Sequence, residues 1–227
     1  MNYGMNDHSV NDRPAGAPSS PRSRGRPRVD DKRRRILDAA LRVFAERGFH
    51  GTAVPLVADA AGVGTGTLYR YFTSKEQLVN EVFRDAKTRL GATLLGDLDA
   101  ALAPASLFLE LWRRLARFAR AEPLAFQFLE MQDHAPYLDA ESRKTELEVL
   151  GPIWMAGQAL REQRLTRDLP IEILIALVWG ALVGLLKAER LGYFALSDDM
   201  IERAGEACWD AVRARQTSPS KSKRRKV

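Results

Sequence analysis

The chain has 227 residues, of which 45% are hydrophobic and 28% are charged, a balance that is ordinary for a folded globular protein and argues against wholesale disorder. Its single cysteine, Cys208, excludes an intrachain disulfide, and its three widely spaced histidines leave no metal-binding pattern. We therefore expect a cytoplasmic protein that carries neither a metal ion nor another cofactor.

The net charge of +6 is unevenly distributed along the chain. Residues 31–90 carry a net charge of +4, whereas residues 91–215 carry −5. A basic N-terminal third joined to an acidic body indicates that the first part binds a polyanion, for which nucleic acid is the obvious candidate, while the body has another role.

Residues 1–29 are rich in Pro, Gly, Ser and Arg, which predicts a disordered basic arm. Within this arm Arg24 and Arg26 belong to an Arg-Gly-Arg-Pro-Arg run that resembles the core of an AT-hook, in which Arg-Gly-Arg lies in a narrow A·T minor groove. A solvated linker explains the same composition equally well.

Helical periodicity begins near residue 30, where apolar residues from Ile36 to Phe44 recur at helical spacing and Gly48 supplies a stop. Two short helices follow, the first from Pro55 to a stop at Gly62, and the second over residues 65–72. Ser74 and Gln77 then form a capping-box pattern, with Gln77 reaching back, ahead of a longer helix that continues to about residue 95.

Beyond residue 90, glycines and prolines divide the chain into helical segments, and no alternating strand pattern occurs. We therefore predict an all-helical body without strands. Pro152 either kinks or splits the third of its helices. The predicted helices lie near residues 104–121, 123–133, 138–165, 170–191 and 198–215. The expected fold is therefore all-α, with a three-helix helix-turn-helix domain over residues 30–78, a linking helix, and a larger helical ligand-binding and dimerisation domain over residues 96–215.

Two further segments need an interpretation. The apolar stretch 171–186 is short for a membrane span and is interrupted by Glu172, and the N-terminus has no apolar core of an export signal, so we expect neither. The tail 216–227 ends in a basic run, Lys221–Lys226, that suits nuclear targeting, an auxiliary phosphate contact or a solubilising tail.

The two short helices joined by Ala61-Gly62-Val63 have the sequence features of a helix-turn-helix, whose second helix enters the major groove of DNA. A small apolar seam would hold them together, leaving several polar residues of the second helix outward. The seam residues are Val57, Ala58, Ala61, Leu68, Tyr71 and Phe72, and the outward ones are Thr65, Thr67, Tyr69 and Arg70.

The stretch RRRILDAALRVFAERGFHGTAVPLVADAAGVGTGTLYRYFTSKEQL resembles the N-terminal domain of TetR family repressors through G-F-x-x-T, A-x-x-A-G-V, G-T-L-Y-x-Y-F and S-K-x-x-L. The resemblance implies phosphate contacts from Tyr69, Lys75 and Thr52. It also implies that Thr65, Thr67 and Arg70 face the groove of double-stranded operator DNA. Two positions depart from the common pattern, because Ala53 and Gly64 stand where the family often has capping hydroxyl residues.

Other interpretations remain open at this point. The helices could merely pack against each other, and the protein could be an architectural DNA-binding protein without a ligand. An enzyme or carrier could use a cavity in the helical body, although no catalytic constellation is present. A phosphate loop at residues 62–66 is weakly supported, because the third glycine of a dinucleotide motif, a preceding strand and a P-loop Lys-Ser/Thr are all missing.

The body contains more large aromatic and Met side chains than helix pairing requires, which predicts an apolar cavity for a small hydrophobic effector. Each residue taken alone is more typical of ordinary core. The candidate ligand-binding residues are Trp112, Phe126, Met131, His134, Trp154 and Trp179. The resemblance implies that the effector moves the helix near residues 74–95 and thereby changes the separation of two DNA-reading heads.

The segment PIEILIALVWGALVGLLKAERLG is apolar on nearly all faces, so one face is expected to meet a partner. Gly180 and Gly184 lie four residues apart and would let another helix approach closely, with Val183 beside them. The resemblance implies a homodimer formed through the last two helices. Packing of these glycines within one subunit is the alternative.

Overall fold

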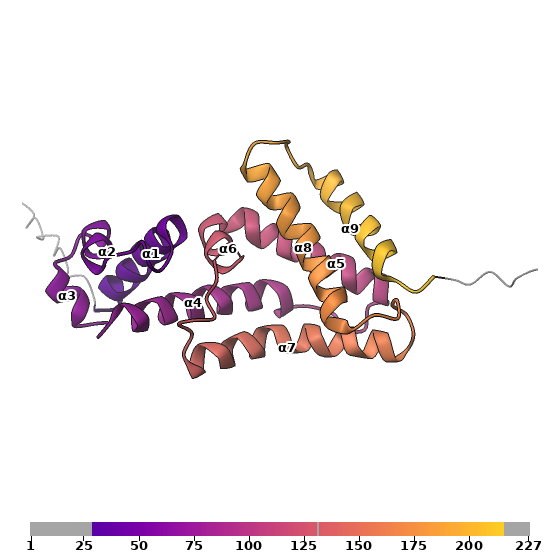
Figure 1. The fold of residues 1–227 in the computed structure, drawn as a ribbon, viewed down its shortest axis with the longest axis horizontal. Coiled ribbons are helices and arrows are strands. Elements are labelled where there is room, and N and C mark those ends of the chain that lie inside the picture. The colour runs from indigo at the N-terminus through magenta and orange to yellow at the C-terminus, as the bar shows by residue number, and fades with distance from the viewer. Residues whose placement is uncertain (1–28, 131, 216–227) are drawn as a thin grey trace, which may run out of the picture.

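A computed structural model describes residues 29–130 and 132–215 of the chain (Figure 1). Within these residues the chain forms nine α-helices, and the isolated antiparallel bridge between Thr166 and Arg213 is the only β-type pairing. The all-α fold class is therefore confirmed. The helices are α1 (Val29–Arg47), α2 (Val54–Ala61), α3 (Thr65–Tyr69), α4 (Lys75–Leu95), α5 (Pro104–Ala121), α6 (Pro123–Glu130), α7 (Ala140–Glu162), α8 (Ile171–Arg190) and α9 (Asp198–Val212).

Helices α1, α2 and α3 form a small domain at one end of the molecule (Figure 1). The glycines that the sequence marked as stops do end α1 and α2, because Gly48 and Gly62 adopt left-handed φ values of 69° and 64°. That conformation costs glycine little and other residues more. Helix α3 is shorter than expected, since it ends at Tyr69 instead of Phe72.

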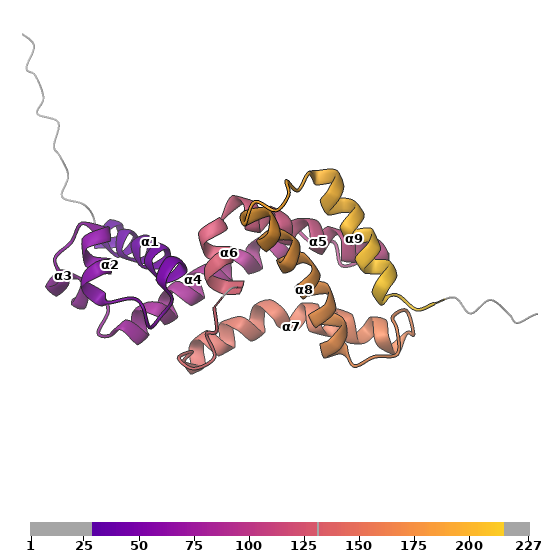
Figure 2. The ribbon, with the colours of Figure 1, turned by 45° about the horizontal axis from the view of Figure 1, so that its top comes forward.

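Helix α4, which has 21 residues, joins the small domain to the body (Figures 1 and 2). The Ser74 hydroxyl caps its N-terminus by accepting a 3.1 Å hydrogen bond from Gln77 N. The return bond of the expected capping box is displaced by one residue, because Gln77 Oε1 accepts from the backbone N–H of Thr73 at 2.6 Å. The cap therefore fixes both the helix start and the turn that leads into it.

The small domain docks on the body through α6 and the α6–α7 connection. Gln127 Nε2 on α6 donates a 2.7 Å hydrogen bond to Ala45 O, one of the last carbonyls of α1. Tyr137 stacks on Phe49, with ring centroids 4.4 Å apart, and its carbonyl accepts from Asn80 Nδ2 of α4 at 2.9 Å. The two parts therefore share one continuous core and hydrogen-bonded joints.

Helix α7 runs alongside α4 (Figure 1) and remains one helix through Pro152. The buried Lys87 of α4 forms an ion pair with Glu146 of α7 at 3.4 Å, and Gly91 lets Val149 approach closely. A side chain at Gly91 would meet Val149 at 2.8 Å, so the close approach requires glycine. These contacts hold α4 and α7 against each other along their length.

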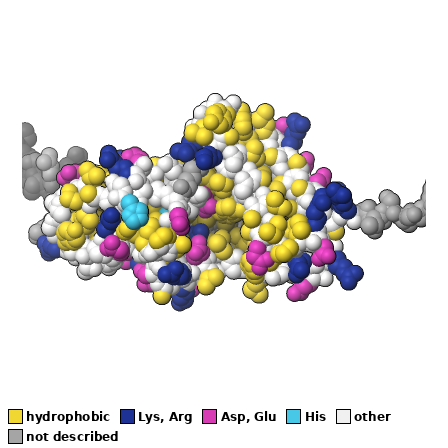
Figure 3. Space-filling model, in the orientation of Figure 1, with side chains coloured by type: hydrophobic (Ala, Val, Ile, Leu, Met, Phe, Trp, Pro, Cys, Tyr) yellow, Lys and Arg dark blue, Asp and Glu magenta, His cyan; other side chains and the backbone are white. Residues whose placement is uncertain are grey.

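Helix α8 exposes much of its apolar surface, and hydrophobic side chains are visible over this part of the body in Figure 3. Ile173 and Leu177 are 49% and 52% exposed. Among the described residues it is the one helix whose length and composition would suffice to cross a membrane, yet only 22% of its most apolar 18-residue window is buried within the subunit. Much of the apolar surface of α8 is therefore left uncovered in a single subunit.

Candidate nucleic-acid interface and sensing body

The candidate DNA-reading surface is built on α3. Leu68 and Phe72 are buried and anchor the segment to the domain core, while Tyr69 is 48% exposed and Arg70 is exposed at the end of the helix. Thr65 and Thr67 are half-buried. The segment thus presents a phenol and a guanidinium to solvent, which are groups that can donate to phosphate oxygens or base edges.

Backbone groups and a distant arginine fix the short helices in place of side-chain caps. Ala53 and Gly64, the N-cap residues of α2 and α3, make no side-chain capping hydrogen bond, as their residue types dictate. Arg35 of α1 donates a 2.6 Å hydrogen bond to Ala61 O at the end of α2. The turn before α3 is therefore held by α1 and by the left-handed Gly62.

Thr52 does not lie where the expected phosphate contact requires. Its side chain is only 2% exposed, and its hydroxyl donates to Gly48 O at 2.7 Å. The hydroxyl of Thr52 ties the loop after α1 to the end of that helix, so it is engaged within the protein in this structure.

Lys75 is half-buried at the start of α4, with its ammonium directed at the loop between α1 and α2. Its Nζ donates to Phe49 O at 3.0 Å and to Thr52 O at 3.1 Å, and lies 4.2 Å from the centroid of the Phe49 ring. An ammonium has three donors, so one remains for another acceptor. Lys75 therefore fixes the loop while keeping a positive charge beside the free N–H groups of a helix N-terminus.

The arginines near the start of α1 are engaged within the protein. Arg33 pairs with Glu81 at 2.6 Å, and Arg34 pairs with Asp85 of α4 at 2.8 Å. These ion pairs join α1 to α4 and neutralise part of the basic charge that the sequence places in this third of the chain. The sequence pattern could not separate these arginines from Arg70, because their partners lie about fifty residues away.

The expected sensing residues do not gather around one cavity. Trp112 is buried between α5 and α9, where its Nε1 donates to Ile201 O at 2.8 Å. The ring of His134 is also buried, with Nε2 2.6 Å from Phe128 O and Nδ1 2.6 Å from the Tyr137 hydroxyl. Both side chains are buried and hydrogen-bonded within the protein, which is typical of ordinary core residues.

The other expected sensing residues are dispersed. Phe126 lines a surface hollow of about 330 Å³ between α5, α6 and α8, and Trp154 is 38% exposed on α7. Trp179 of α8 donates through Nε1 to Glu130 Oε2 at 2.6 Å. Met131 lies outside the described residues, as do Arg24 and Arg26 of the N-terminal arm.

An apolar cavity does exist, but it lies elsewhere in the body. It has a volume of about 110 Å³ and lies between α5, α7, α8 and α9, and none of the described expected residues lines it. Its walls include Leu111, Ile153, Ile171, Leu174 and Trp209. In the sequence these residues appear only as apolar positions on helix faces. Residues that line a cavity and residues that fill the core have the same pattern there. Among the described residues, no group of three or more His, Cys, Asp or Glu side chains is placed to hold a metal ion.

The glycines of α8 face outward. A Cβ atom added at Gly180 or at Gly184 would meet no atom of the subunit within 4 Å. Val183 is half-buried and packs against the core of its own subunit. The two glycines therefore do not serve close packing against another helix of the same subunit. Val183 lies at the border between the core and the exposed face of α8.

An exposed α3 on a three-helix head, a long α4 and a separate helical body define a two-domain DNA-binding regulator. Family models support this class along most of the chain. Residues 36–82 match the bacterial regulatory proteins of the tetR family, and residues 83–214 match a tetracyclin repressor-like C-terminal domain. The chain belongs to the TetR family, and it is a ligand-responsive, DNA-binding transcriptional repressor.

Individual relatives agree with this assignment. The chain is 28% identical over 179 residues to the HTH-type transcriptional repressor KstR2 of Mycobacterium tuberculosis, a match covering 72% of this chain and 88% of the relative. It is 37% identical over 121 residues to KstR2 of Mycolicibacterium smegmatis, covering 53% and 54% of the two chains. A TetR family transcription regulator from Marinobacter aquaeolei has the same fold, with a TM-score of 0.75, 26% identity and coverage of 83% and 98%.

Proposed function

We propose that this protein binds a palindromic operator as a homodimer and that a small hydrophobic molecule releases it. The observation that carries the proposal is the exposed Tyr69–Arg70 pair at the end of α3, held in place by buried Leu68 and Phe72. Tyr69 and Lys75 would contact phosphates, whereas Arg70, with Thr65 and Thr67 beside it, would read base edges in the major groove. A protein that binds chromosomal DNA in this way is expected to act in the cytoplasm.

The dimer rests on the open apolar face of α8. Gly180 and Gly184 have free space beside them, and the neighbouring Ile173 and Leu177 are about half exposed. A twofold interface would bury this face against its own copy and would hold two heads at a fixed spacing, as a palindromic operator requires.

The coupling between the effector and the operator would pass through α4 and α6. Helix α4 is tied to α7 by the Lys87–Glu146 pair, and the end of α1 is tied to α6 by Gln127. A ligand that displaces α7 or α6 must therefore also displace the DNA-reading head. A coupling free energy of roughly 1–3 kcal/mol would change operator affinity about 5- to 150-fold.

The test is a selection of genomic fragments by the purified full-length protein, followed by footprinting. The expected result is a site with two inverted half-sites whose centres lie one helical turn, about 34–36 Å, or a multiple of it apart. Uniform recovery of fragments with no protected sequence would indicate an architectural DNA-binding protein and would contradict the proposal.

A further inference from the structure

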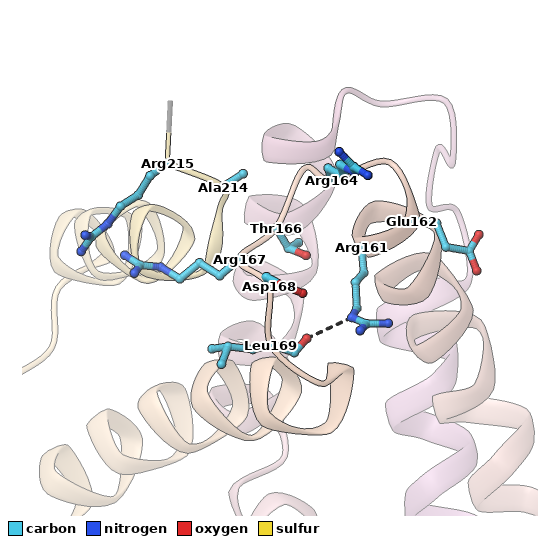
Figure 4. Close-up of a pocket in the computed structure, with 9 residues that line it drawn as sticks. All are labelled: Arg161, Glu162, Arg164, Thr166, Arg167, Asp168, Leu169, Ala214 and Arg215. Atoms are coloured by element: carbon cyan, nitrogen blue, oxygen red, sulfur yellow. Dashed lines mark hydrogen bonds between the residues drawn. The ribbon is translucent and has the colours of Figure 1, made fainter. Parts of the chain in front are cut away.

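The end of the body opposite the DNA-reading head contains a further cavity (Figure 4). Here the loop between α7 and α8 meets the residues that follow α9. Arg167 N donates to Val212 O at 2.8 Å and Ala214 N donates to Leu165 O at 2.9 Å, so the two segments are fixed to each other. A surface cavity of about 830 Å³ opens beside this pairing, a volume within the range of small-molecule sites.

Four arginines line this cavity, from three different segments. They are Arg161, Arg164, Arg167 and Arg215. Figure 4 shows Arg167 and Arg215 extending to one side of the loop and Arg161 lying on the other. Glu162 and Asp168 are the only acidic residues in the lining, so the lining carries an excess of positive charge.

None of these four guanidinium groups forms an ion pair with any residue in 29–130 or 132–215. Some other arginines of the body are neutralised, as Arg113 is by Glu202 and Arg114 by Glu110. A guanidinium presents a planar fork of donors that matches phosphate and carboxylate oxygens. Arg161 donates one hydrogen bond, from Nε to Leu169 O at 3.1 Å, and the remaining donors of the lining are available to an anion.

Two buried polar atoms in the cavity wall have no hydrogen-bond partner. They are Thr166 Oγ1 and Arg167 Nε, and only four such side-chain atoms occur in the described part of the chain. A buried donor without an acceptor costs about 1–3 kcal/mol. Oxygen atoms of an anion that reaches these two groups would supply acceptors for both.

Arg164 has an unusual backbone conformation for an arginine. It has a φ of 57°, the only positive φ of a non-glycine residue in the described chain, and it follows the C-cap of α7. The Leu165 N to Leu160 O hydrogen bond closes this helix end in the pattern that normally places glycine at such a position. An arginine there costs about 1–2 kcal/mol of local stability.

The basic cavity adjoins the apolar cavity described above, because Thr166 lines both. On the apolar side its neighbours include Leu160, Ile171 and Trp209. A ligand could therefore place a charged end among the arginines and a hydrocarbon end between α5, α7, α8 and α9.

We propose that this paired site binds an amphiphilic anion whose phosphate group lies in the arginine-lined cavity and whose hydrocarbon part enters the apolar cavity past Thr166. A phosphate fits better than a single carboxylate, since the arginine-rich lining offers more charge and more donors than one carboxylate can use. That this is also the effector site rests on the function proposed above, whereas the binding itself does not.

Calorimetric titration of the full-length protein with octyl phosphate, inorganic phosphate, octanoate and 1-octanol tests the site. Octyl phosphate is expected to bind at least tenfold more tightly than any of the other three. Octanoate binding as tightly as octyl phosphate would contradict the assignment to phosphate. Equal binding of 1-octanol, or no binding of octyl phosphate, would overturn the site.

Variants separate the two halves of the site. Arg167→Ala should weaken octyl phosphate binding at least fivefold, and Ala156→Leu, which fills the apolar cavity, should reduce octyl phosphate to the affinity of inorganic phosphate. Arg164→Gly should weaken octyl phosphate while leaving Tm unchanged or raising it, a combination that general unfolding cannot produce. Arg203→Ala, an exposed arginine of α9 outside the cavity, is the matched control and should bind as the wild type does.

The same titration on the operator complex separates this proposal from the function. Octyl phosphate binding that leaves operator affinity unchanged would keep the site but would contradict its assignment as the effector site. Failure of the ligand-free protein to select an operator would instead contradict the proposed function and would leave the calorimetric result standing.

Discussion

Trp179 and Glu130 join α8 to α6 through a partly buried hydrogen bond, in which the indole Nε1 donates to Oε2 at 2.6 Å. Burial raises the pKa of the Glu130 carboxyl above its usual value, and the nearby Glu146 acts in the same direction. Lys87 and the indole oppose this shift by favouring the charged form. The carboxyl therefore sits at a meeting point of α4, α6, α7 and α8, where its ionisation works against folding.

Replacing Glu130 by Gln is expected to stabilise the protein, relative to the wild type, more at pH 7 than at pH 4. Because the pKa of Glu130 is raised in the folded state, its favourable contribution is complete below the unfolded pKa of about 4.5 and is lost as pH rises through the folded pKa. Glutamine keeps the acceptor for Trp179 without the charge. The difference in Tm between variant and wild type should be more positive at pH 7, by about 2–4 °C for each kcal/mol. Glu148→Gln, an exposed residue of α7, is the control.

Replacing His134 by Gln is expected to remove an acid-sensitive contribution to stability. Burial is the main cause that lowers the pKa of the His134 ring below 6.5. This contribution is therefore present above pH 6.5 and is lost as pH falls through the folded pKa. The variant should lose about 1–3 kcal/mol at pH 7 through its broken hydrogen bonds, with a smaller loss at pH 5. An equal loss at both pH values would contradict the assigned role, and the exposed His50→Gln should show neither effect.

Arg70→Ala is expected to weaken binding more on the operator than on random DNA, by about 1–3 kcal/mol, because a base contact is lost. Tyr69→Phe removes only a hydroxyl proposed to meet phosphate, so its smaller loss should be the same on both DNAs. Fluorescence anisotropy with operator and scrambled duplexes measures the two effects. Equal losses for Arg70→Ala on both duplexes would assign it to the backbone.

Lys75→Met is expected to have two separate effects. Loss of a phosphate contact should lower affinity on all DNA and reduce the slope of log affinity against log salt by about one. Loss of the donor to Phe49 O and Thr52 O should lower the free energy of unfolding by about 1 kcal/mol. Lys144→Met, on the exposed surface of α7, is the control for charge. A destabilised variant with an unchanged salt slope would restrict Lys75 to holding the loop.

Gly184→Leu is expected to shift the protein toward monomer in sedimentation and to weaken operator binding while helicity by circular dichroism is retained. The leucine meets no atom of its own subunit near Cβ, so its bulk would project into the proposed partner. Gly151→Leu of α7 also introduces leucine where no atom lies near Cβ, and it should remain dimeric. A folded Gly184→Leu dimer with full affinity would remove the glycines from the interface.

Local chemistry explains what could be predicted of this fold. The stops at Gly48 and Gly62 and the cap at Ser74 depend on residues within one helical turn, so they can be recognised in the sequence. The exposed Tyr69 and Arg70 follow from the same local periodicity. The register of the last turn was less predictable, since α3 ends at Tyr69 and Gln77 reaches Thr73 instead of Ser74.

By itself the sequence determined an all-α chain with a basic, helix-turn-helix head and an apolar α8, because periodicity, caps and composition act over short distances. Only the tertiary structure decided how each polar or aromatic group is used. It buried the hydroxyl of Thr52, turned Lys75 onto carbonyls 23 and 26 residues away and enclosed Trp112 in core. Whether a side chain lines a cavity or fills one depends on the volume left between distant helices, and that volume is a property of packing that no local pattern contains.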